Sequence, residues 1–324
     1  MRKSFFKLSL GVFLITFLIG AEGFSAFLKF DSKKWSAYTS FGYLFDNNIS
    51  LNPTQNRRDA SLTHQQGNAF AAQVKPTYTT PFKNWGMVSL TNSFFGQWHW
   101  DAYQRRYNVW EYALTPKFTT SSMLWGKEVF WTLPFTYAAI FSGAQRSTRI
   151  AQIYNTYDFF PSWTYVHSAK CDTTLDANIG VQDSKNGAGI TNRDGRHYNV
   201  GFGQGFRLSV KNLDMDWNGG YHYDRLNTKG SQFDERSHIY HLKTAFPFFF
   251  KTSMGLGIEF VGKRFLQHTR SFREHGQNYD VSFVKICPNS IGVSLNTRIA
   301  KWTARPSNIN YNQVAVLANM FYTF

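Results

Sequence analysis

The stretch YNVGFGQGFRLSV, residues 198–210, decides the fold class because its side chains alternate in character. Its even positions are mostly aliphatic or aromatic, and its odd positions are glycine or polar. The stretch LDMDWNGGYHYD, residues 213–224, repeats the alternation after a short turn at residues 211–212. Successive side chains of a β-strand point to opposite faces, so each stretch predicts a strand with one face for lipid and one for water.

The alternation recurs along the chain and predicts about fourteen strands, an even number of the kind that single-chain bacterial barrels have. It is clean at residues 175–182 and 293–299 and less clean at 128–142, where apolar residues fall on both faces. We therefore expect an all-β fold, a closed antiparallel transmembrane β-barrel. The expected strands are 35–45, 68–79, 87–102, 106–119, 128–142, 150–168, 173–183, 196–210, 213–225, 237–249, 252–266, 277–286, 290–303 and 313–324.

The connections between these strands alternate in length. Those after odd-numbered strands are long and polar, as at 46–67, 183–195, 226–236, 267–276 and 304–312. Those after even-numbered strands are short, as at 169–172, 211–212, 250–251 and 287–289. Transmembrane barrels have short periplasmic turns and longer extracellular loops, whereas a soluble β-sandwich has no reason to sort its loops in this way.

The N-terminal residues 1–23 have the layout of a secretory signal peptide, with basic residues before an apolar run and small residues near Gly23. The run 8–19 is shorter than the ~20 residues of a spanning helix, which disfavours the alternative of an uncleaved anchor. We expect cleavage after Gly23, which leaves residues 24–324 as one barrel domain. No cysteine lies at the cut, so a lipid-anchored protein is not expected.

The composition fits a membrane barrel better than a soluble domain. Aromatic residues make up 18% of the 324 residues and charged residues only 17%. Aromatic girdles at both rims and an apolar lipid face account for this balance, which tandem soluble sandwiches do not need. After the signal segment, no run is apolar and long enough to predict a transmembrane helix.

The last strand ends in an aromatic residue, Phe324, and shares an apolar face with Tyr322. This arrangement resembles the C-terminal signal that the barrel assembly machinery reads in its substrates, so we predict that Tyr322 and Phe324 form that signal. An ordinary amphipathic strand is the alternative.

The two cysteines test the strand order. Cys171 falls in the turn after the sixth expected strand and Cys287 in the turn after the twelfth, on nearly opposite sides of the wall. A disulfide needs Cα atoms within ~7 Å, so we predict two free thiols.

The formal net charge of +15 indicates that the protein has an anionic partner. The expected signal peptide and barrel place the chain away from nucleic acid, which argues against nucleic-acid binding. We expect basic residues in the loops and near strand ends to face lipopolysaccharide phosphates; they are Arg57, Arg58, Arg193, Arg196, Arg225, Arg236, Lys263, Arg264, Arg270, Arg273 and Arg305. The inward positions of Arg207, Lys243, Lys263 and Arg298 suggest a lumen that attracts anions. The residues expected to line the lumen are Arg207, Asp214, Asp216, His222, Asp224, Lys243, Glu259, Lys263 and Arg298.

The sequence contains no catalytic motif of the common hydrolase, zinc-protease, thiol-redox or nucleotide-binding kinds, and we expect no enzyme activity, cofactor or metal site. Asp214, Asp216, His222 and Asp224 share one strand face, but residues two apart lie ~7 Å from each other. A wetted lumen lining explains these four side chains without a reaction. The alternating glycines of 201–205 are expected to thin the lumen wall rather than to bind a nucleotide.

Three fragments resemble the barrel of the surface lipoprotein assembly modifier (Slam) family. They are GYLFDNNISL at 42–51, RDGRHYNVG at 193–201 and SNINYN at 307–312. The resemblance implies a fourteen-strand barrel that helps to move lipoproteins to the cell surface. The family also carries a periplasmic helical-repeat domain, and no repeat of ~34 residues occurs here, which puts the export role in doubt.

These observations predict a channel or translocator in the outer membrane of a Gram-negative bacterium, porin-like or Slam-like. Its expected partners are outer-membrane lipid, lipopolysaccharide, the barrel assembly machinery and, for an exporter, a lipoprotein substrate. The alternative is a non-conducting surface barrel that is structural or adhesive and binds ligands through its extracellular loops.

Overall fold

The computed structural model describes residues 35–47, 67–82, 85–101, 104, 107–143, 150–185, 193–210, 213–230, 234–266, 272–305 and 309–324. The expected signal segment 1–23 lies outside them, and so do parts of the long connections. Among the described residues, no helix is long and apolar enough to cross a membrane.

The described chain forms one antiparallel sheet of fifteen strands. The strands are β1 (Trp35–Asp46), β2 (Gly67–Phe82), β3 (Gly86–His99), β4 (Val109–Leu124), β5 (Lys127–Gly143), β6 (Ile150–Phe159), β7 (Ser162–Ser168), β8 (Cys171–Ser184), β9 (Gly195–Val210), β10 (Leu213–Thr228), β11 (Glu235–Phe248), β12 (Thr252–Phe265), β13 (Phe272–Ile286), β14 (Ile291–Arg305) and β15 (Ile309–Thr323).

Strands β6 and β7 together occupy one position in the wall, because both pair with β5 on one side and β8 on the other. The interruption falls at Phe160 and Pro161, and proline cannot donate a hydrogen bond to the strand ladder. The fifteen strands therefore fill fourteen positions, which confirms the predicted count.

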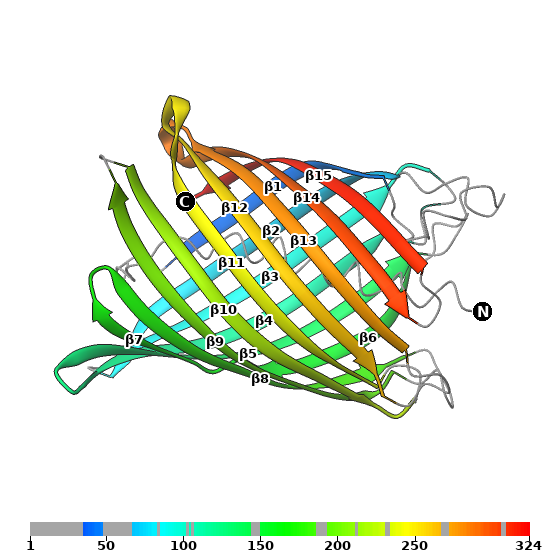
Figure 1. The fold of residues 1–324 in the computed structure, drawn as a ribbon, viewed down its shortest axis with the longest axis horizontal. Coiled ribbons are helices and arrows are strands. Elements are labelled where there is room, and N and C mark those ends of the chain that lie inside the picture. The colour runs from blue at the N-terminus through cyan, green and yellow to red at the C-terminus, as the bar shows by residue number, and fades with distance from the viewer. Residues whose placement is uncertain are drawn as a thin grey trace.

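The sheet closes on itself through the first and last strands. Tyr38 of β1 lies opposite Thr323 of β15, and Asp46 lies opposite Ala315. The seam continues to the C-terminal residue, where the Phe324 carbonyl accepts a hydrogen bond from Ala37 N at 3.1 Å. Each strand thus has a partner on both sides, and the wall exposes no unpaired edge (Figure 1).

The observed strands match the predicted ones closely. The differences lie at the ends, except that the strand predicted at 150–168 is interrupted and forms β6 and β7. β13 begins at Phe272 rather than 277. The prediction missed this extension because residues Arg273 to Gly276 show no apolar alternation. β4 continues to Leu124 rather than ending at 119. The prediction missed this extension because its threonines and serines show no apolar alternation. The predicted short connections after β7, β11 and β13 are confirmed, and 211–212 lies outside the described residues. The connections at 249–251 and 288–290 place Phe250 and Asn289 at positive φ.

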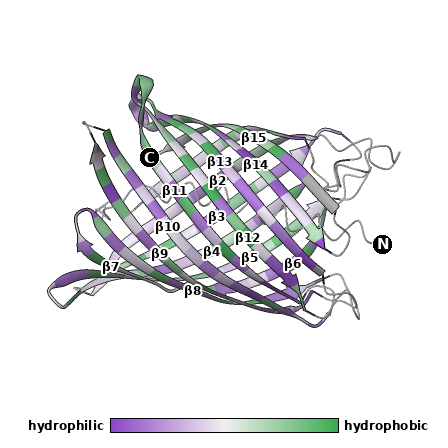
Figure 2. Ribbon diagram, viewed as in Figure 1, coloured by the Kyte–Doolittle hydropathy of each residue, from purple (hydrophilic) through white to green (hydrophobic). Residues whose placement is uncertain are grey.

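The two faces of the wall differ in character, as the alternating colours along the strands in Figure 2 show. We call the face that carries Arg207, Asp216 and Arg298 the polar face. The opposite, apolar face carries Phe202 and Leu208, which are 46% and 51% exposed. Exposed aromatic and aliphatic side chains on a closed single-layer wall are suited to contact with lipid.

Both cysteines are free thiols, as predicted. Cys171 is the first residue of β8, and Cys287 follows β13.

Candidate functional site: the polar face of the wall

Three basic side chains of the polar face are held by carboxylates on the next strand. Arg298 of β14 donates two hydrogen bonds to Asp280 of β13, at 2.6 and 2.9 Å. Arg207 of β9 donates to Asp216 of β10 at 2.8 Å. Lys263 of β12 lies 3.0 Å from Glu235 of β11. Arg298 and Arg207 are directly opposite their partners, and Lys263 is diagonal to Glu235. Direct and diagonal neighbours on adjacent strands share a face, so the positive charge of these groups is locally compensated.

A row of histidines crosses the middle of this face. The Nδ1 atom of His222 lies 3.5 Å from Asp176 Oδ1, two strands away. On its other side, the His222 ring stacks on His241 with centroids 5.4 Å apart. His241 Nε2 then hydrogen-bonds to Asn218 Oδ1 at 2.9 Å. The row links β8, β10 and β11 through polar groups alone.

A second polar chain runs nearer the long connections. His197 of β9 contacts Asp224 of β10 through Nε2 and Asn178 of β8 through Nδ1, the latter at 3.0 Å. Asn178 in turn donates to Asp158 of β6 at 3.3 Å. Four neighbouring wall positions are thereby joined at one level of the barrel.

The remaining predicted residues have simpler surroundings. Asp214 accepts a hydrogen bond from Ser209 at 2.6 Å, and Glu259 accepts one from Asn278 at 2.7 Å. Lys243 lies beside His241 on β11, and its Cγ is 3.5 Å from the place where a Cβ on Gly257 would lie.

The four residues Asp214, Asp216, His222 and Asp224 do not form one site. Each has a different partner on the polar face, and within the described part of the chain no group of three or more histidine, cysteine or acidic side chains is arranged to hold a metal ion. The partners Asp176, His197, Glu235, His241 and Asp280 were not singled out from the sequence. The period-two alternation of their strands is enough to assign these residues to the polar face. The pairing register between neighbouring strands is needed to show which side chains are in contact.

Glycines on the polar face leave room for these contacts. A Cβ on Gly201 would lie 2.4 Å from both Asp176 Oδ1 and His222 Nδ1, because the two side chains meet above that glycine. A Cβ on Gly205 would lie 2.7 Å from Asp172 Oδ2. Of these three, only Gly203 would accept a Cβ without a close contact, since the Cβ would meet Asn218 Nδ2 at 3.9 Å. The glycines expected to thin the wall therefore mostly seat polar side chains from the neighbouring strands.

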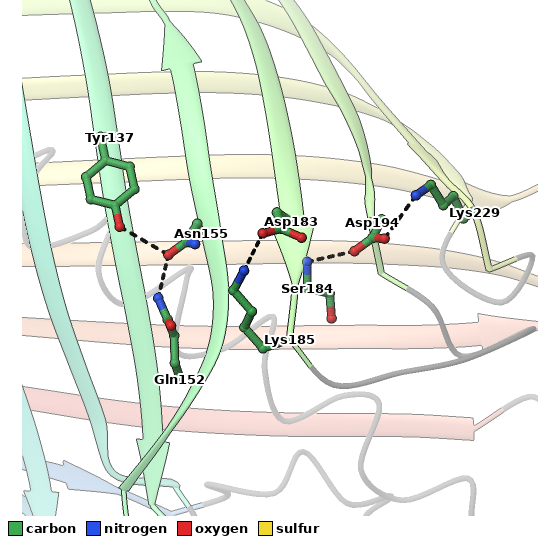
Figure 3. Close-up of polar contacts among 8 residues, drawn as sticks. All are labelled: Tyr137, Gln152, Asn155, Asp183, Ser184, Lys185, Asp194 and Lys229. Carbon is green, nitrogen blue, oxygen red and sulfur yellow. Dashed lines mark hydrogen bonds and ion pairs between the residues drawn. The ribbon is translucent and has the colours of Figure 1, made fainter.

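Figure 3 shows another set of polar contacts, at the ends of β6, β8, β9 and β10 next to the long connections. Asp194 accepts hydrogen bonds from Ser184 N at 2.7 Å and from Lys229 Nζ at 3.1 Å, which ties three strand ends together. Lys185 Nζ lies 2.5 Å from Asp183, and this hydrogen bond raises the pKa of Lys185. These contacts fix the rim rather than the middle of the wall.

The predicted assembly residues lie on the apolar face. Tyr322 and Phe324 are 42% and 57% exposed, and their rings stack with centroids 6.0 Å apart. Recognition by an assembly machinery stays a prediction.

A closed antiparallel wall of this strand count, with one apolar and one polar face, is a β-barrel of the outer-membrane type. No protein-family model and no characterised protein sequence matches the chain. Among solved structures, a bacterial polysaccharide outer membrane secretin is similar at 9% identity and a TM-score of 0.47, covering 91% of this chain and 100% of that one.

Two further similar structures are channels by their descriptions. An anion-selective porin from Comamonas acidovorans is 7% identical with a TM-score of 0.46, covering 90% of this chain and 98% of that one. The TodX ΔS2S3 mutant monoaromatic hydrocarbon channel is 8% identical with a TM-score of 0.46, covering 94% of each chain.

Proposed function

We propose that this barrel is a channel in a Gram-negative outer membrane and that the polar face lines its lumen. The observation that carries the proposal is the combination of a closed wall with two unlike faces. Asn278, Asp46 and Glu274 of the polar face are 0%, 1% and 2% exposed. In a single curved layer, side chains crowd and shield one another on the concave side, which supports an inward polar face.

The charges on the polar face favour cations. Its basic residues in the barrel wall are Lys75, Lys117, Arg207, Lys243, Lys263 and Arg298. Three of them form the ion pairs described above, and each pair cancels one basic and one acidic charge.

Acidic side chains outnumber them. Toward the long connections, the polar face includes Asp46, Glu111, Asp158, Asp224, Glu235 and Glu274. Toward the short turns, it includes Asp172, Asp176, Asp214, Asp216, Glu259 and Asp280. Carboxylates at every level of a lumen attract cations along its whole length. We therefore propose a cation preference in place of the anion preference that the sequence suggested.

Single-channel recording in planar bilayers under a KCl gradient tests both statements. We expect ion conductance and a reversal potential with the sign of a K⁺-selective pore. Asp172→Asn with Asp176→Asn removes two carboxylates and should shift that potential toward zero, whereas Asp183→Asn on the apolar face should leave it unchanged. A silent bilayer would instead favour the non-conducting, ligand-binding barrel.

Assistance in lipoprotein export is a narrower form of the proposal and rests only on the Slam resemblance. Two of its fragments, 42–51 and 307–312, extend beyond the described residues. Co-expression with a surface lipoprotein, followed by protease digestion of intact cells, tests it: export predicts digestion of the lipoprotein only when the barrel is present.

A further inference from the structure

Five arginines lie side by side across five consecutive strands at the rim of the long connections. Arg225 of β10 is directly opposite Arg236 of β11, and Arg236 is directly opposite Arg264 of β12. Arg264 is opposite Arg273 of β13, which is opposite Arg305 of β14. We call this set the arginine row. The five strands are neighbours in Figure 1. Each arginine is one residue away from a polar-face position of its own strand, so the row lies on the apolar face.

Such a row is unfavourable without anions. Like charges directly opposite each other on neighbouring strands destabilise a sheet. The Arg225 guanidinium has a partner, Asp234, at 3.1 Å. Arg236, Arg264, Arg273 and Arg305 form no hydrogen bond or ion pair with any described residue. Because the repulsion is not relieved within the described protein, an outside anion is the simplest compensation.

The apolar face changes in steps away from the row, as a lipid-facing wall does. Four residues further along the strands, ~13 Å away, lies a level of mainly aromatic and polar side chains: Tyr221, Tyr240, Phe260, Gln277 and Lys301. Two residues beyond it, the level is largely aliphatic, with Leu242, Ile258 and Ile299. Aromatic side chains mark the interface of a membrane, which places the arginines at headgroup height.

The residue below the middle arginine of the row is a glycine. Gly262 lies two residues from Arg264 on the same face, and a Cβ there would meet only His275 Nδ1, at 3.9 Å. No side chain of its own therefore stands between Arg264 and the membrane side.

We propose that the arginine row binds the phosphate groups of a phosphorylated lipid headgroup in the surrounding membrane. Guanidinium groups bind phosphate through paired hydrogen bonds. With strands ~4.8 Å apart, the row is ~19 Å long, which suits a headgroup that carries more than one phosphate. This proposal and the proposed channel both require that the apolar face points toward lipid. Binding of a lipid headgroup does not require that the barrel conducts ions.

The test compares Arg236→Gln/Arg264→Gln/Arg273→Gln with a matched control at the opposite rim, Lys127→Gln/Lys251→Gln/Lys285→Gln. Both variants lose the same charge. The probes are purified lipopolysaccharide, the same lipid after enzymatic removal of its phosphates, and inorganic pyrophosphate. Lipid retained by the purified protein is measured by native mass spectrometry, and thermal stability is measured with and without each probe.

We expect the arginine variant to retain at least tenfold less intact lipopolysaccharide than wild type, and the lysine control to retain it as wild type does. Dephosphorylated lipid should bind wild type as poorly as intact lipid binds the variant. Without lipid, the arginine variant should melt at the wild-type temperature or above, because repulsion is removed. Unchanged retention in the arginine variant, or equal loss in the control, overturns the proposal.

Two further arms complete the design. If pyrophosphate alone stabilises wild type as strongly as the lipid does, the site binds free phosphate and the lipid assignment is wrong. If the triple variant does not fold, Arg273→Gln/Arg305→Gln replaces it, since both side chains are exposed, and a smaller but clear loss of retention is expected. Conductance of the variants is recorded in parallel, so that a failed channel proposal and a failed lipid proposal give different results.

Discussion

Gly220 and Gly203 are directly opposed on β10 and β9 and offer a matched pair for testing the register of the polar face. A Cβ on Gly220 would lie 2.6 Å from the Phe202 carbonyl oxygen and 2.6 Å from Cε1 of His241. The imidazole can rotate away, but the backbone oxygen cannot. A Cβ on Gly203 would meet only Asn218 Nδ2, at 3.9 Å.

Gly220→Ala should therefore destabilise the barrel by about 1–3 kcal/mol, the usual cost of forcing an extra carbon into a filled space. Gly203→Ala should stabilise it by about 0.4–1 kcal/mol, because alanine restricts the unfolded chain. The two unfolding free energies should differ by about 1.4–4 kcal/mol, measured by urea unfolding in lipid vesicles with tryptophan fluorescence. Equal values, or a more stable Gly220→Ala, would refute the register on which the histidine row depends.

Three other outcomes follow from named contacts. Arg298→Gln should lower the unfolding free energy by about 3 kcal/mol, because it leaves Asp280 unpaired in a largely buried position, and adding Asp280→Asn should recover part of that loss, as a double-mutant cycle will show. Lys185→Gln should have no measurable effect on urea unfolding, because its ion pair with Asp183 is exposed to solvent; a clear destabilisation contradicts this. Cys171 and Cys287 should both react with maleimide in unfolded protein, and mild oxidation of the folded barrel should produce no crosslink between them by mass spectrometry.

The strand pattern was accessible from the sequence because each wall strand has one lipid face. Residues 198–210 and 213–224 alternate so regularly that β9 and β10 were predicted to within a few residues. The start of β13 was missed because both faces of residues 273–276 carry polar side chains or glycine near the rim. Alternation in the sequence shows which face a residue occupies only where one face of the wall contacts lipid and the other contacts water.

The contacts within the polar face were not accessible in the same way. Asp176 and His222 meet across Gly201 because a side chain is missing between them, which depends on the register of three strands. The arginine row depends on the register of five. Sequence spacing alone does not give these registers, since the long connections leave the relative shift of the strands open.

The net charge of the chain does not by itself indicate the charge of the lumen. A value of +15 describes the whole chain, whereas selectivity depends on the residues at one face. Many of the described basic residues lie at the rims, as the arginine row does, and the polar face carries more carboxylates than basic groups. The same charge therefore fits a cation-selective lumen and an anion-binding outer rim.

The assignment of the two faces is tested most directly by thiol modification during bilayer recording. In a background with Cys171→Ser and Cys287→Ser, Gly203→Cys places a thiol on the polar face and Val200→Cys places one on the apolar face. A charged, water-soluble methanethiosulfonate reagent should reduce the single-channel current of the Gly203→Cys protein and leave that of the Val200→Cys protein unchanged. Block at Val200→Cys without block at Gly203→Cys would mean that the faces are reversed and that the polar face does not line a conducting lumen.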